Sequence, residues 1–177
     1  MNDLVMLTAL LRGPAYGYAL KKTAGLIFGS GSMHNNVIYP SLKRFVGNGW
    51  VEQTTVPGDR GQERKQYRIT AQGRRHLLAQ VATFGEDDAR DEGAFLLRLA
   101  MFDLLPAGKR CTIVAARKSF LTARSTELSQ LRYAAEPTSY PSMALSRVQQ
   151  RVRDELRWIR QIEANLETGK GGSNASK

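Results

Sequence analysis

Residues 34–50, HNNVIYPSLKRFVGNGW, carry polar side chains whose types and spacing suit the reading of nucleic acid. Asn36, Tyr39 and Lys43 follow one another at intervals of three and four residues, so a helix would present them on one face. In the major groove of DNA, Asn can pair bidentately with adenine and Lys can bind guanine. The alternative is that the Asn side chains only cap the helix while the basic side chains face solvent.

Pro40 determines where this helix can begin. Proline lacks an N–H donor and is tolerated near the start of a helix, so we expect the helix to begin close to Asn35 or Asn36. Recognition helices commonly use their N-terminal residues on base edges. The sequence leaves open which of the first three polar residues contacts a base and which only caps the helix. The candidate nucleic-acid contacts of this segment are His34, Asn35, Asn36, Tyr39, Lys43 and Arg44.

A basic loop follows the helix. Residues 50–56 and 64–70 alternate and are rich in β-branched or aromatic residues, which predicts two strands of a hairpin. Arg60, Arg64 and Lys65 lie in or beside the glycine-bearing loop between them. Long cationic side chains on such a loop suit phosphate contact, whereas the alternative for each of them is a role in solubility alone.

Two tyrosines follow the Gly13-Pro14 turn, at the expected start of the second helix. The free N–H groups of a helix start can bind phosphate, and a Tyr hydroxyl can add a donor. We favour Tyr18 as the contact, and the alternative is that Tyr16, Tyr18 or both pack in the core.

The positive charge is concentrated in the first half of the chain. The whole chain has 177 residues and a formal net charge of +10. Residues 1–84 contain 11 Lys and Arg against 4 Asp and Glu, a net charge of +7, and residues 85–177 contain 15 against 12, a net charge of +3. A polyanion partner for the first half is therefore favoured, and a basic but inert surface is the alternative.

The elements expected in the first half are those of a winged helix-turn-helix. Apolar spacing predicts a helix over residues 3–12, a second over 16–29 and the recognition segment as the third. The hairpin follows, and Thr70 can cap a fourth helix. Three short helices followed by a two-stranded wing place the third helix in the major groove. The apolar face of the fourth helix is expected to consist of Leu77, Leu78, Val81 and Phe84.

The second half is expected to be all helical. Residues 94–105 are apolar almost all round and should be buried, and residues 107–134 and 142–167 form two long helices. The last of these has a coiled-coil-like apolar seam that suits dimerisation, with an intramolecular core as the alternative. The fold class is thus mainly α with a small β-hairpin. The expected domains are a DNA-binding domain at 1–84, an acidic connector at 85–93, a helical dimerisation domain at 94–168 and a disordered tail at 169–177.

Three segments together resemble the PadR family of transcriptional regulators. They are LTALLRGPAYGYAL, VIYPSLKRFVGNGWVE and GQERKQYRITAQGRRHL, all within the first 84 residues. The resemblance extends more weakly to FLLRLAMFDLL and WIRQIE, which are similar to the C-terminal helices of the longer, virulence-activator-like members. The chain departs from the family pattern at Tyr16, where a His is common, and at Asn36-Val37-Ile38 before the Tyr-Pro pair.

The resemblance implies a bacterial, cytoplasmic homodimer that binds an inverted repeat in double-stranded DNA, most often as a repressor. It assigns DNA contact to Tyr18, Tyr39, Lys43 and the basic residues of the wing. Several PadR-like regulators respond to small aromatic compounds held in the dimer region. The candidate effector-binding residues here are Phe95, Arg98, Phe102 and Trp158, and the alternative is ordinary packing, since the two Phe residues are one heptad apart.

The sequence lacks the residue patterns that a metal-binding protein or an enzyme would need. Cys111 is the only cysteine, and His34 and His76 are the only histidines, so we expect no disulfide within the chain, no metal site and no cofactor. No nucleophile–base pairing or glycine-rich phosphate loop stands out, so the protein is not expected to be an enzyme. The sequence has no run of about 18 consecutive apolar residues, so no membrane span is predicted. The runner-up function is a winged-helix module that binds another protein and whose basic face is incidental.

Overall fold

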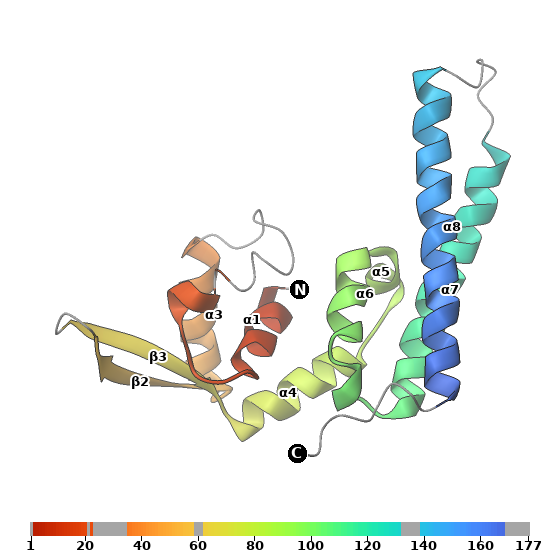
Figure 1. The fold of residues 1–177 in the computed structure, drawn as a ribbon. Coiled ribbons are helices and arrows are strands. Elements are labelled where there is room, and N and C mark those ends of the chain that lie inside the picture. Colours follow the sequence, from red (N-terminus) through yellow and green to blue (C-terminus); the bar gives the residue numbers. More distant parts are fainter. Residues whose placement is uncertain (1, 21, 23–34, 59–61, 132–138, 169–177) are drawn as a thin grey trace. The chain divides into compact units, whose positions relative to one another are not determined.

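The computed structural model divides the chain into two compact units. It describes residues 2–20, 22, 35–58, 62–131 and 139–168. We call Met1–Thr83 the winged unit and Phe84–Lys177 the helical unit, and each is described by itself. Helices dominate both units, and the described sheet lies in the winged unit (Figure 1). The expected fold class, a mainly α protein with a winged helix-turn-helix followed by helices, is confirmed.

The winged unit contains helices and a three-stranded antiparallel sheet in the order β1-β3-β2. The hairpin is confirmed, because β2 pairs with β3 from Val51 opposite Ile69 to Pro57 opposite Glu63. Its elements are α1 (Asn2–Leu10), β1 (Ala15–Tyr16), α3 (Asn35–Gly47), β2 (Val51–Pro57), β3 (Glu63–Ile69) and α4 (Ala71–Ala82).

The third strand corrects the expectation for residues 15 and 16. We expected Tyr16 to open the second helix, but Ala15 and Tyr16 instead pair with Tyr67 and Gln66 on the free edge of β3. The helical residues begin only at Gly17. The reason is tertiary: the edge of β3 satisfies backbone groups that a helix start would leave unpaired.

The recognition segment forms α3 where Pro40 allows it. The described helix runs from Asn35 to Gly47, and Pro40 lies within it near its start. Its C-terminus is closed by a Schellman motif, in which the Trp50 N–H donates to the Phe45 carbonyl at 2.9 Å and the Gly49 N–H donates to the Val46 carbonyl at 3.0 Å. Gly49 has the left-handed φ of +70° that this motif requires, and the Phe45 and Trp50 rings pack with centroids 5.9 Å apart.

The connection from the wing to α4 is closely packed. The Gly73 N–H donates to the Thr70 hydroxyl at 2.9 Å, which confirms Thr70 as the N-cap. The Thr70 hydroxyl donates to the Gly49 carbonyl at 2.6 Å, and the Thr70 N–H donates to the Trp50 carbonyl at 2.9 Å. These bonds join the start of α4 to the turn between α3 and β2.

Two of the residues expected on the buried apolar face of α4 do not belong to it. Leu77 and Val81 are buried, but the Leu78 side chain is exposed because it follows Leu77 by one residue and so projects about 100° away from it around the helix. Phe84 lies beyond the end of α4 at Ala82 and belongs to the helical unit, where its ring meets the Phe95 ring edge-on at 6.3 Å. The buried apolar side chains of the winged unit are Leu4, Val5, Met6, Leu7, Leu10, Leu20, Ile38, Leu42, Phe45, Val51, Tyr67, Ile69, Leu77 and Val81.

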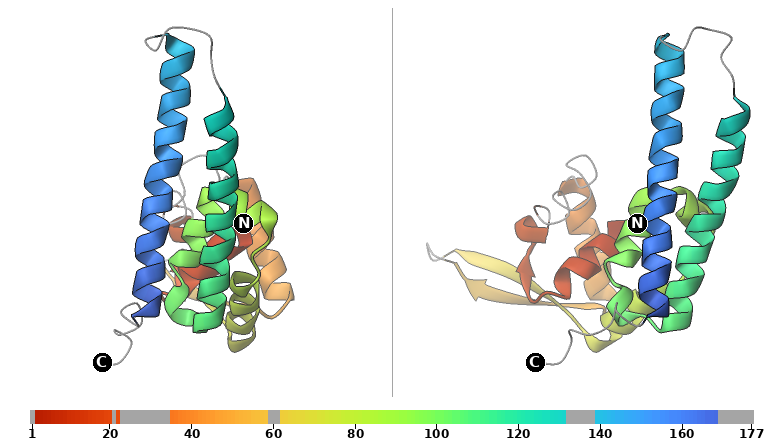
Figure 2. Two further views of the ribbon diagram at one scale, coloured as in Figure 1. Left: turned by 90° about the vertical axis from the view of Figure 1, so that its right-hand side faces the viewer. Right: turned by 45° about the vertical axis from the view of Figure 1, so that its right-hand side comes forward.

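The helical unit is built on two long helices that lie side by side, α7 and α8 (Figures 1 and 2). Within the described residues, no helix is both long and apolar enough to span a bilayer. The expected tail at 169–177 lies outside the described residues. The elements of this unit are α5 (Glu86–Arg90), α6 (Glu92–Leu99), a 3-10 turn (Phe102–Leu104), α7 (Ala107–Gln130) and α8 (Tyr140–Glu167).

The acidic segment 85–93 differs from the solvated connector that we expected. It contains α5, whose Ala89 is buried, and the Asp91 side chain caps α6 by accepting the N–H groups of Gly93 and Ala94 at 2.8 and 3.2 Å. Carboxylates are favourable in the first turn of a helix, so an acidic run supports two successive helix starts.

The apolar seam of α8 is only partly covered, since Val152 and Ile159 alone among its apolar residues are buried.

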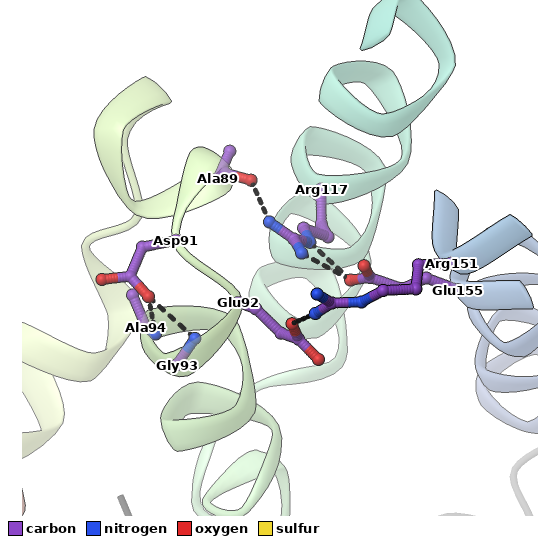
Figure 3. A network of polar contacts seen from close by, with 8 residues as sticks. All are labelled: Ala89, Asp91, Glu92, Gly93, Ala94, Arg117, Arg151 and Glu155. Atoms are coloured by element: carbon purple, nitrogen blue, oxygen red, sulfur yellow. Dashed lines mark hydrogen bonds and ion pairs between the residues drawn. The ribbon is translucent and has the colours of Figure 1, made fainter. Parts of the chain in front are cut away.

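A buried arginine joins three helices of this unit (Figure 3). Arg117 of α7 is 3% exposed, and its Nε and Nη2 lie 2.7 and 2.6 Å from Oε1 of Glu155 on α8. Its Nη1 donates to the Ala89 carbonyl of α5 at 2.7 Å. A second ion pair lies beside it, in which Nη2 of Arg151 is 3.3 Å from Oε2 of Glu92. Nothing in the local sequence pattern indicated this network.

Candidate nucleic-acid interface

The winged unit has a cavity of about 880 Å³ between α3, the wing and the residues after the Gly-Pro turn. We call it the tyrosine groove. It brings together five of the residues proposed as DNA contacts, namely Tyr18, Tyr39, Lys43, Arg64 and Lys65. The other residues that line it are Tyr16, Gly17, Val46, Gln53 and Tyr67.

Helix α3 presents one face to the groove and a neighbouring face to the core. Tyr39, Lys43 and Val46 line the groove at intervals of four and three residues, and the Tyr39 side chain is 52% exposed. The face about 100° away around the helix is buried in the core through Ile38, Leu42 and Phe45. The helix is therefore held by one face while the other remains accessible to a ligand.

The second wall of the groove is formed by the residues after the Gly-Pro turn. The Tyr16 and Tyr18 rings stack with an interplanar angle of 6° and centroids 6.0 Å apart, and Tyr18 is 64% exposed. Gly17 lies close to the Tyr39 ring, because a Cβ built on Gly17 would lie 3.0 Å from Tyr39 Cε1. The absence of a side chain at position 17 thus lets the Tyr39 ring pack against this wall.

Sequence reasoning missed Tyr67 and Gln53, which face each other across β3 and β2. Tyr67 is 5% exposed, and its burial, followed by the proximity of Tyr39, raises the pKa of its hydroxyl above the ordinary value. The hydroxyl therefore stays protonated near neutral pH and retains a proton to donate. The two-residue periodicity of the strand, which puts Lys65 and Tyr67 on one face, is the signal that could have found Tyr67.

The charge of the groove is positive. Its described lining includes the cations Lys43, Arg64 and Lys65 and no carboxylate. Several tyrosine hydroxyl groups in the same lining are neutral hydrogen-bond donors. Long cationic side chains and hydroxyl donors on one concave surface fit an extended anion such as a phosphodiester backbone.

The remaining predicted DNA contacts are not placed in the groove. Arg44 points elsewhere, since its Nη2 lies 2.6 Å from the Asp3 carboxylate. Asn35 and Asn36 are the first two described residues of α3, and their side chains are outside the described structure. His34 and Arg60 lie outside the described residues.

The predicted effector residues lie in the helical unit. Phe95 is fully buried and meets the Trp158 ring edge-on at 6.0 Å, and Phe102 is also buried. Arg98 is 5% exposed, and its Nη2 lies 3.0 Å from Asp88 Oδ1. A described cavity of about 210 Å³ between α7 and α8 is lined by other residues, including Arg117 and Phe120. The effector assignment of these four residues stays a prediction.

Among the described residues, no group of three or more His, Cys, Asp or Glu side chains is arranged to hold a metal ion. Cys111 is a free, exposed thiol on α7.

Comparisons with known proteins show what the winged unit is similar to. Residues 6–79 match the model of the transcriptional regulator PadR-like family. No curated protein is similar enough in sequence to count as a match. A transcriptional regulator from Clostridium thermocellum is similar over 44% of this chain and 76% of its own, with 24% identity and a TM-score of 0.41.

Two crystal structures of Bacillus subtilis PadR are similar over most of the chain. The complex with operator DNA is 19% identical, covers 93% of this chain and 98% of its own, and has a TM-score of 0.43. The complex with p-coumaric acid is 18% identical over the same shares of the two chains, with a TM-score of 0.37.

Proposed function

We propose that this chain, whose residues 6–79 match the model of the PadR-like family of transcriptional regulators, is a member of that family and that its tyrosine groove binds double-stranded DNA. The observation that carries the proposal is the clustering of Lys43 of α3 with Arg64 and Lys65 of β3 and with tyrosine hydroxyls around one groove. In this arrangement α3 enters the major groove and the wing follows the neighbouring backbone. The DNA strand that runs between α3 and the wing passes over the tyrosine groove, where cations and hydroxyls contact its phosphates.

The chemistry divides the groove residues by role. Lys43, Arg64 and Lys65 release counterions from phosphates and so supply affinity that depends steeply on salt. Tyr18 and Tyr39 are exposed and donate hydrogen bonds that fix the register of the protein on the duplex. The N-terminal residues of α3, Asn35 and Asn36, are our candidates for base readout, as is His34, which precedes them.

We further propose that the protein is a repressor that acts as a homodimer on an inverted repeat and is released by a small aromatic effector. The accessible apolar side chains on α8 and at the end of α7 support a second copy as partner: Leu131, Tyr140, Met143 and Val148 are all exposed. The dimerisation domain of this proposal spans 94–168, and the DNA-binding domain spans 1–84. Bacillus subtilis PadR, which has been crystallised with operator DNA and with p-coumaric acid, has the partners that we propose here. The proposed location is the bacterial cytoplasm, and no enzymatic activity is proposed.

Removing the groove cations is expected to weaken DNA binding and its salt dependence together. Lys43→Ala and Arg64→Ala should each lower affinity about fivefold to tenfold at about 0.15 M salt and reduce the salt slope by about one. Fluorescence anisotropy of the full chain with duplex from upstream of its own gene, against random duplex, measures both quantities. Lys109→Ala, which removes an exposed cation from the helical unit, is the matched control and should change neither.

Footprinting on the same DNA tests the dimer. Two protected half-sites about one helical turn apart, or a multiple of it, are expected for a two-fold symmetric reader. Equal binding to the promoter duplex and to random duplex would contradict the proposal that the protein is a transcriptional regulator. If that result came with a function insensitive to charge reversal of Arg64 and Lys65, it would favour the winged-helix module that binds another protein.

A further inference from the structure

Arg44 and Lys43 are neighbours in sequence but project from different faces of α3. Consecutive residues of a helix are separated by about 100°, so Lys43 can line the groove while Arg44 does not. Arg44 instead reaches α1, where its Nη2 lies 2.6 Å from each carboxylate oxygen of Asp3. These two residues are 41 positions apart in the chain. The contact is therefore a tertiary link between two helices.

The pair also joins two helix ends of opposite polarity. Asp3 lies in the first turn of α1, and Arg44 lies in the last turn of α3. A carboxylate is favourable at a helix N-terminus and a cation at a C-terminus, so each charge is stabilised by its own helix as well as by its partner. Because the carboxylate neutralises the guanidinium, Arg44 adds little to the positive field that attracts DNA.

The elements that α1 and α3 pack against explain why this link matters. Helix α1 packs mainly on α4 and β3, while α3 packs on β2. A rotation of α3 about its axis would move Tyr39 and Lys43 out of the groove. The Asp3–Arg44 pair opposes that rotation from the side of α3 that faces away from the groove.

We propose that Arg44 is a positioning residue for DNA recognition, acting through Asp3, rather than a phosphate contact. The inference rests on the proposed DNA-binding function of the groove. The side chains of Arg44 and Asp3 are 53% and 44% exposed, so the pair is solvent-accessible and its effect is modest. Loss of either partner should weaken DNA binding about twofold to fivefold, the range that an exposed ion pair supports.

A double-mutant cycle in the full chain tests the proposal. Asp3→Asn, Arg44→Gln and the double variant should weaken binding to the promoter duplex by the same factor, because each removes the same link. The charge swap Asp3→Arg with Arg44→Asp should recover part of the loss. None of these variants should change the salt slope by more than a few tenths, whereas Lys43→Gln, the matched neighbour, should lower it by about one.

A phosphate contact would give a different pattern and would overturn the proposal. In that case Arg44→Gln alone would lower the salt slope by about one, and Asp3→Asn would leave affinity unchanged or raise it by freeing the guanidinium. Hydrogen exchange of the α3 amides without DNA gives a readout that does not depend on the proposed function. Faster exchange in both single variants is expected, and unchanged exchange in both would also overturn the inference. If wild type and variants alike do not prefer the promoter while exchange changes as expected, the proposed function fails and the link between the helices stands.

Discussion

Glu155→Ala is expected to lower the free energy of unfolding of the helical unit by about 3 to 5 kcal/mol. The substitution leaves the Arg117 guanidinium buried at 3% exposure without its carboxylate. The guanidinium also lies over the Phe95 and Phe120 rings at 5.9 and 5.6 Å, and these apolar rings supply no charge to replace the carboxylate. An uncompensated buried charge is among the largest costs that a single substitution can impose.

Hydrogen exchange of the α7 and α8 amides measures this loss in the full chain, where a single unfolding transition is not assured. Glu163→Ala is the matched control: it removes the partner of Lys118, which lies 2.7 Å away on a side chain that is 43% exposed, and it should cost no more than about 1 kcal/mol. Arg117→Met combined with Glu155→Leu should restore most of the stability, because the buried charge is then gone. Equal losses for Glu155→Ala and Glu163→Ala would show that the burial of Arg117 is unimportant.

Gly73→Ala is expected to destabilise the winged unit by about 3 kcal/mol, at the upper end of overpacking effects. A Cβ on Gly73 would lie 2.0 Å from the Trp50 carbonyl oxygen and 2.8 Å from its carbon. This clash involves backbone, which cannot move aside by changing rotamer. The same carbonyl accepts the Thr70 N–H at 2.9 Å, so relief of the clash must separate α4 from the start of β2.

Because β2 carries one strand of the wing, this substitution should also weaken DNA binding. Hydrogen exchange of α4 and β2 measures the stability, and anisotropy with the promoter duplex measures the affinity. Gly47→Ala is the control, since a Cβ at Gly47 would have no atom within 4 Å apart from its chain neighbours and the backbone of its own helix, and its φ is not positive. It should leave stability unchanged or raise it by up to about 1 kcal/mol, as alanine is favoured over glycine in a helix. If Gly73→Ala lowered the free energy of unfolding by less than a typical surface substitution does, the close contact with Trp50 would be contradicted.

Several parts of the candidate site could be predicted from the sequence because they depend on local spacing. The intervals between Tyr39, Lys43 and the buried residues of α3 determine which face packs and which face is open. Pro40 limits where the helix can start, and Gly49 supplies the left-handed residue that ends it. The alternation of β-branched residues determines the hairpin. In each case the signal lies within one or two turns or strand repeats, where chain geometry alone decides which side chains share a face.

Only the tertiary structure decided the contacts between residues far apart in the chain. Tyr16 has the local features of a helix start, yet it joins the sheet because β3 offers a free edge. Arg44 resembles Lys43 in sequence, and only the position of Asp3 on α1 separates their roles. Arg117 is the one buried cation of α7, whose other cations are exposed or half-buried, and it is buried because α5 and α8 close over it. The physical reason is the same throughout: periodicity determines the face of an element, and the packing of elements determines what that face meets.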